Sequence, residues 1–172
     1  DFLGLRNLSL IESILKSIYY KEKIKVDLQA IPINDEKTFA LLQSGKTTGI
    51  FQLESEGMRN VLTQLKPTNF EDIVAVNAFY RPGPMANIPT FIRRKHGEEK
   101  VVYPHPDLTE ILQPTYGVIV YQEQIMQIAS KMAGFSLGEA DLLRRAVSKK
   151  KREILDQERN HFVQGAIKNG YN

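Results

Sequence analysis

The sequence has 172 residues, of which 42% are hydrophobic and none is cysteine, and 23 basic against 20 acidic residues give a net charge of +3. This length suits one ordinary domain with a buried core, and the composition excludes a disordered chain, a collagen-like repeat and a disulfide scaffold. Without cysteine there are no thiol nucleophiles, iron–sulfur clusters or common zinc sites, and no apolar run reaches the ~20 residues of a membrane helix. With no signal-peptide pattern at the start, we expect a cytoplasmic protein.

The first third of the chain carries the spacing of helices with one extended segment between them. Apolar residues recur at helical spacing over residues 6–23, which predicts a first helix. Asn34 is the expected N-cap of a second helix that stops at Gly45. Residues 47–53 are rich in Thr, Ile and Phe, so we expect them to be extended. A further helix is predicted over residues 55–65, before a proline.

The middle of the chain predicts two helices around a rigid turn. Residues 68–71 have the spacing of a capping box and predict a helix that runs through Phe79. That helix must end at residues 81–84, Arg-Pro-Gly-Pro, because the two prolines fix the backbone and cannot donate hydrogen bonds. A short helix is then predicted within residues 89–96, and one helical turn over residues 107–112.

The last third predicts one short strand and three helices. Residues 118–120 are all β-branched, which is typical of a strand. Apolar residues between 125 and 132 mark the buried stripe of a helix. A second capping box at residues 136–139 opens a helix that carries a pair of arginines, and residues 153–168 are expected to be helical. The predicted fold class is mainly α, a helical domain with a few short β-strands.

Positive charge is concentrated near the end of the chain. Residues 131–152 contain seven basic and two acidic residues, whereas the remaining 150 residues sum to −2. Such a concentration costs self-repulsion unless an anion relieves it, so it favours binding to polyphosphate or to a nucleic-acid backbone. Within this cluster, one of Arg144 and Arg145 could point into a cleft while the other pairs with Asp141. The alternative is a solvated basic face with ordinary helical ion pairs.

Aromatic residues lie close in sequence to the basic stretches. They are Phe79, Tyr80, Tyr116 and Tyr121. Base stacking would use such residues beside cations, but core packing is the preferred interpretation for most of them.

The chain begins inside an apolar pattern, Asp1-Phe2-Leu3-Gly4-Leu5, and has no initiating methionine. Because natural domain ends are more often polar, we expect a fragment of a longer protein. By residue type alone, Asp1 is either a capping residue or a metal ligand.

Five longer strings occur in order along the chain. They are DFLGLR from Asp1, TGIFQLES from Thr48, YRPGP from Tyr80, TYGVIVYQEQ from Thr115 and GEADLLRRA from Gly138. Together they resemble the bacterial DNA polymerase III alpha subunit family, the C-family replicative polymerases, and they span essentially the whole chain. The resemblance implies the end of the palm and a connecting helix over residues 1–30, and a truncated fingers domain over residues 31–172.

The resemblance also implies roles for particular residues in extending a primer with dNTPs by two-metal phosphoryl transfer. Asp1 corresponds to one of three palm aspartates that hold two Mg²⁺ ions, and the other two lie upstream of this chain. Arg144 and Arg145 match arginines expected at the nucleotide phosphates, and Arg81, held extended by the proline that follows it, would reach the nucleotide or brace its pocket. Phosphate contacts with DNA are expected from a further set of basic residues: Lys149, Lys150, Lys151, Arg152, Arg93 and Arg94.

The implied partners are primer–template DNA and dNTP, with the sliding clamp and other replisome subunits bound through regions outside this chain. The isolated chain is expected to be inactive, because one carboxylate cannot position two metal ions. Two other classes of function fit the residues without the resemblance. One is a non-catalytic helical module that binds nucleic acid through its basic face, and the other is a protein-interaction scaffold.

Overall fold

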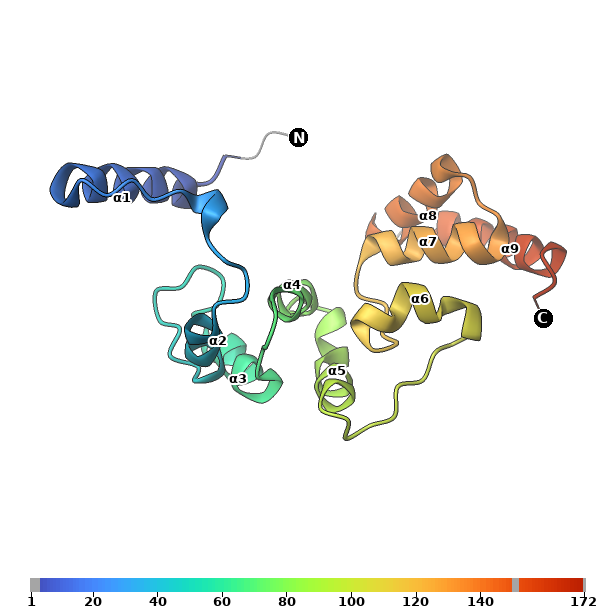
Figure 1. Ribbon diagram of the computed structural model, residues 1–172. Coiled ribbons are helices and arrows are strands. Elements are labelled where there is room, and N and C mark those ends of the chain that lie inside the picture. Colours follow the sequence, from blue (N-terminus) through green and yellow to red (C-terminus); the bar gives the residue numbers. More distant parts are fainter. Residues whose placement is uncertain (1–3, 150–151, 172) are drawn as a thin grey trace. The chain divides into compact units, whose positions relative to one another are not determined.

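The computed structural model describes residues 4–149 and 152–171, and the regular structure in these ranges is helical (Figure 1). The prediction of a mainly α fold is therefore confirmed. The chain divides into two compact units, with the boundary between Asp35 and Glu36. No helix within the described ranges is both long enough and apolar enough to cross a membrane.

The first unit contains one long helix, as predicted. Helix α1 spans Arg6–Glu22 and ends at Lys23, whose backbone adopts a left-handed conformation and donates from its N–H to the carbonyl of Tyr19. A single 3₁₀ turn, η1 (Leu28–Ala30), follows and is capped by the carboxylate of Asp27. None of the residues of α1 is buried, so the apolar side chains that give the helix its spacing face outward in this unit.

Helices α2 to α5 of the second unit surround its larger core. They span Glu36–Gln43 (α2), Glu56–Leu65 (α3), Phe70–Phe79 (α4) and Ile88–Lys95 (α5), with the 3₁₀ turn η2 at Pro84–Asn87. At the centre of this core the rings of Phe79 and Phe91 meet edge to face, with centroids 4.9 Å apart. The buried residues of this core are Phe39, Leu42, Leu53, Met58, Leu62, Leu65, Ala75, Val76, Phe79, Ile88, Phe91 and Ile92.

Helix α4 begins one residue later than the predicted capping box places it, with Asn69 and not Thr68 as its N-cap. The side chain of Asn69 accepts from the backbone N–H of Asp72, and the carboxylate of Asp72 accepts from the backbone N–H of Thr68. The same carboxylate lies 3.2 Å from the ammonium of Lys95 at the end of α5, and both side chains are more than nine-tenths buried. A buried ion pair therefore joins the start of α4 to the end of α5.

The prediction of a few short β-strands is wrong for the part of the chain that the structure describes. Residues 47–53 form consecutive turns, in which the N–H of Ile50 donates to Thr47 and that of Leu53 donates to Ile50. Residues 118–120 are irregular because local groups take their hydrogen bonds. The N–H of Val120 donates to the side chain of Gln124, which leaves no ladder for a partner strand.

The remaining helices of the second unit pack around a core of small residues. Helix α7 contacts both α8 and α9, which lie beside it in Figure 1. The buried residues between them are Ala129, Ala133, Phe135 and Ala140, so the helix backbones approach closely. The elements are η3 (Pro106–Leu108), α6 (Thr109–Leu112), η4 (Gln113–Thr115), α7 (Gln122–Ala133), α8 (Leu137–Lys149) and α9 (Arg152–Lys168).

The closest of these approaches is at Gly165 of α9. A Cβ atom there would overlap the backbone carbonyl of Ala133 at the end of α7. We expect Gly165→Ala to lower the free energy of unfolding by about 1–3 kcal/mol, since forced overpacking outweighs the better helix propensity of alanine. Urea denaturation followed by circular dichroism measures this. Gly138→Ala in α8 is the matched control, because a Cβ there meets nothing within 4 Å. Equal stability of the two variants would contradict the close packing.

Candidate phosphate-binding site

The predicted arginine pair lies on α8, and both members share one carboxylate. The Nε and Nη2 atoms of Arg144 donate to Oδ1 of Asp141 at 2.9 and 2.7 Å. Nε of Arg145 lies 2.7 Å from Oδ2 of the same residue. The expectation that one arginine pairs with Asp141 while the other points into a cleft is therefore wrong. Residues three and four positions after an aspartate both lie on its face of a helix, so the carboxylate reaches both.

The two arginines differ in what remains available to a ligand. Arg144 also donates from Nη1 to the side chain of Gln122, 2.9 Å away at the start of α7, and is 30% exposed. Gln122 in turn donates to the hydroxyl of Ser148 on α8. Arg145 is 63% exposed, and within residues 4–149 and 152–171 its Nη atoms have no hydrogen-bond partner. Arg144 therefore ties α8 to α7, while Arg145 presents free donors to solvent.

The charge state of Asp141 keeps this arrangement intact near neutral pH. Hydrogen bonds from Arg144, followed by the charges of both arginines, hold the pKa of this carboxyl below its ordinary value. A lowered pKa means that the interaction is fully present above the ordinary pKa of an aspartic acid. It is lost only as the pH falls through the lowered value.

A capping box places α8. The hydroxyl and backbone N–H of Ser136 donate to the carboxylate of Glu139 at 2.7 and 2.8 Å, as the sequence predicts. These bonds lower the pKa of Glu139. The start of α8, two turns before the arginines, is thereby held in place.

In the second basic group, as in the first, two neighbouring arginines share one carboxylate. Arg93 and Arg94 at the end of α5 both bind the carboxylate of Glu99, Arg93 through Nη2 at 2.8 Å and Arg94 through Nε at 2.9 Å. Arg94 also donates from Nη1 to the backbone carbonyl of Tyr116. Hydrogen bonds from Arg93 and then Arg94 lower the pKa of Glu99. Arg93 is the more exposed of the two, 47% against 14%, so its guanidinium is the more accessible to a ligand.

Arg81 lies in the turn that follows α4, as predicted. Its Nε donates to the backbone carbonyl of Ala78 at 3.1 Å, and its side chain is exposed. No ion pair in the described ranges involves Arg81, so its charge is available.

Several predicted residues lie outside the described ranges or at their edge. They are Asp1, Lys150 and Lys151, which fall in the gaps, and Lys149 and Arg152, which end α8 and begin α9. Among residues 4–149 and 152–171, no group of three or more His, Asp or Glu side chains could hold a metal ion. The metal role of Asp1 therefore remains a prediction.

The aromatic residues near the basic stretches belong mainly to the core, as preferred from the sequence. Phe79 is fully buried, and Tyr80 and Tyr116 pack against the larger core, where Tyr116 meets Phe91 with ring centroids 5.2 Å apart. Burial raises the pKa of Tyr116 and of Tyr121. These rings are therefore poorly placed to stack on a base.

Sequence reasoning missed three features of the sites. Gln122 lies 22 residues from Arg144, and no spacing rule connects them. Glu99 reaches back to its arginines because Gly97 turns the chain with a φ of +74°. A third group, lysines interleaved with Tyr19 and Tyr20 at the end of α1, was visible in the sequence as alternating cations and aromatics.

A protein-family model matches the chain along nearly its whole length. Residues 7–170 match the model of the bacterial DNA polymerase III alpha subunit finger domain.

Curated proteins named DNA polymerase III subunit alpha are similar to the chain over 171 residues, 99% of its length. The identity is 71% for the protein of Bacillus subtilis (strain 168), 63% for that of Halalkalibacterium halodurans and 61% for that of Staphylococcus epidermidis. The chain spans only 15–16% of the length of these relatives.

Proposed function

Because this chain belongs to the bacterial DNA polymerase III alpha subunit finger domain family, we propose that it is the nucleotide-binding fingers region of a template-directed DNA polymerase. In this role it binds the triphosphate of an incoming dNTP while a longer polypeptide extends a primer on template DNA. Residues 1–30 would be the end of the palm, and residues 31–172 the fingers.

The arginine pair of α8 carries this proposal. A triphosphate needs several cationic donors at defined positions, and the planar fork of arginine suits phosphate oxygens better than lysine does. Asp141 and Gln122 hold Arg144, and the exposed Nη atoms of Arg145 supply the donors. We assign the direct phosphate contact to Arg145 and the bracing of that contact to Arg144, with Arg81 as a further cation for the nucleotide.

The other basic residues are assigned to the DNA backbone. Lys149, Lys150, Lys151 and Arg152 form a run of four positive charges, which favours contacts that do not depend on base sequence. Arg93 is exposed beside Arg94 and fits the same role.

Asp1 is proposed as a metal ligand by resemblance alone. A carboxylate is the ligand type that Mg²⁺ prefers, and the further carboxylates that two ions need would come from outside this chain.

Alanine at Arg145 tests the nucleotide role in the longer polymerase. We expect kcat/KM for dNTP to fall by about 10²–10³, the loss seen when one donor to a developing charge is removed, while primer–template affinity stays unchanged. Arg145→Lys should recover part of the loss, because it restores the charge without the fork. Steady-state primer extension at varied dNTP concentration gives both parameters.

Arg159→Ala on α9 is the matched control, since Arg159 is also an exposed helical arginine. If kcat/KM for dNTP falls by the same small amount in the Arg145 and Arg159 variants, the nucleotide role of Arg145 is wrong and α8 carries only a solvated basic face. A loss of DNA affinity confined to Arg145→Ala would assign this residue to the DNA backbone instead.

A further inference from the structure

The end of α1 combines positive charge with exposed aromatic rings. Residues 16–25 contain four lysines, one glutamate and two adjacent tyrosines. Tyr19 is 51% exposed and Tyr20 is 70% exposed, unlike Tyr80 and Tyr116, which are half-buried against the core. Lysines at a helix C-terminus offset the helix dipole, but that role does not require exposed rings beside them.

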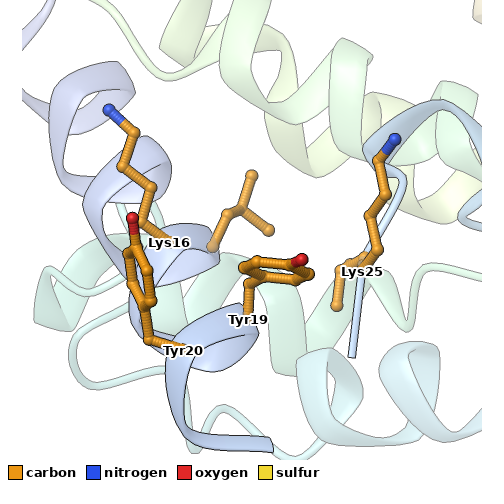
Figure 2. Close-up of a pocket in the computed structure, with 6 residues that line it drawn as sticks. Lys16, Tyr19, Tyr20 and Lys25 are labelled. Carbon is orange, nitrogen blue, oxygen red and sulfur yellow. The ribbon is translucent and has the colours of Figure 1, made fainter. Parts of the chain in front are cut away.

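Four of these side chains, Lys16, Tyr19, Tyr20 and Lys25, line a pocket of about 420 Å³ within the first unit. Figure 2 shows the ring of Tyr19 between Lys16 on one side and Lys25 on the other, with the two ammonium groups extending beyond the ring. The rings of Tyr19 and Tyr20 meet edge to face, tilted by 66° with centroids 6.0 Å apart, so they are not stacked on each other. Leu15 and Val26 complete the apolar part of the lining.

The charges of the pocket are available to an anion. Lys16 pairs with Glu12 at 2.7 Å, but both side chains are about two-thirds exposed, and such pairs contribute little in water. Lys25 makes no ion pair among the residues that the structure describes. The ring of Tyr19, which lies between the side chains of Lys16 and Lys25, therefore faces solvent.

We propose that this pocket binds single-stranded nucleic acid, with a base stacked on Tyr19 and backbone phosphates at Lys16 and Lys25. Ring faces beside cations are the arrangement by which proteins hold single strands without reading their sequence. A duplex does not fit this chemistry, because its bases already stack on each other. An acidic peptide would use the lysines but has no need of the ring. The pocket shares no residue with the arginine site of α8, so the two assignments succeed or fail separately.

Fluorescence anisotropy of a labelled oligothymidylate with the 172-residue chain tests the proposal. Tyr19→Leu should weaken binding about tenfold, within the range for loss of one base stack, whereas Tyr19→Phe should bind like the parent chain. Lys16→Gln combined with Lys25→Gln should lower the slope of log affinity against log salt by about 1.4, or about 0.7 for each phosphate that is no longer neutralised. Lys21→Gln is the matched control, because Lys21 lies on the same helix but does not line this pocket.

Circular dichroism of each variant verifies that the total helix content of the chain is unchanged. Unchanged affinity in Tyr19→Leu would overturn the stacking role, as would an equal loss in Tyr19→Phe. If Lys21→Gln lowers the slope of log affinity against log salt as much per lost charge as the pocket variant does, the lysines of the pocket act only as part of a general basic surface. Displacement of the oligonucleotide by polyglutamate as readily as by unlabelled oligothymidylate would assign the pocket to an acidic protein partner.

Discussion

Replacing Asp72 with alanine is expected to lower the free energy of unfolding of this chain by about 3–5 kcal/mol, because the ammonium of Lys95 is left buried without its partner. The carboxylate also accepts from the backbone N–H and the hydroxyl of Thr68, so two hydrogen bonds just before α4 are lost in the same step, while the Asn69 cap remains. Urea denaturation monitored by circular dichroism measures the change.

Two comparisons separate the effect of the buried charge from that of the lost hydrogen bonds. Glu71→Ala removes an exposed acidic residue from the same turn and should cost much less. Asp72→Leu combined with Lys95→Met removes both charges, and should recover most of the stability lost on removing Asp72 alone. A small loss in Asp72→Ala, no larger than that of Glu71→Ala, would show that the pair contributes nothing.

The metal role proposed for Asp1 predicts the largest effect on activity. Asp1→Asn keeps the shape of the side chain but removes its negative charge. Loss of groups that only support metal ligands costs about 10- to 100-fold, so loss of a ligand should lower kcat in the longer polymerase by more than this. Primer–template affinity should be nearly unchanged, as measured by DNA titration beside steady-state extension.

A capping role for Asp1 makes the opposite prediction. Activity would stay close to that of the parent enzyme, and the thermal stability of the variant would fall instead. Asp27→Asn is a suitable control, since Asp27 caps a 3₁₀ turn of the same unit through a backbone hydrogen bond.

Helices with strong local signals were predictable from the sequence. Ser55 caps α3 with its own hydroxyl, and Ser136 and Glu139 form the box at the start of α8. Such signals act over three or four residues, which is why the bounds of these helices agree closely with the prediction.

The prediction of strands was wrong because β-branched residues favour an extended backbone but do not supply a partner strand for it. At residues 118–120 the nearby groups are Thr115 and the side chain of Gln124. They accept the backbone N–H groups of Val118 and Val120 before any second strand could.

The position of the two arginines beside Asp141 was predictable from the sequence, and the way in which they share its carboxylate was not. Helical spacing places Asp141 beside each arginine but does not say that one carboxylate will hold both. The contact between Arg144 and Gln122 depends on how α7 packs against α8. Such a contact belongs to tertiary structure, and no local pattern encodes it.

The shared carboxylate of Asp141 has a thermodynamic consequence for ligand binding. A long side chain that is free in solution loses rotational freedom when it grips a ligand, at a cost of about 0.5–1.5 kcal/mol for each immobilised chain. Arg144 is already immobilised on two partners, and Arg145 is anchored through Nε. Much of that entropy is lost on folding and not on binding, so the phosphate proposed to bind here would meet donors whose orientation is set in advance.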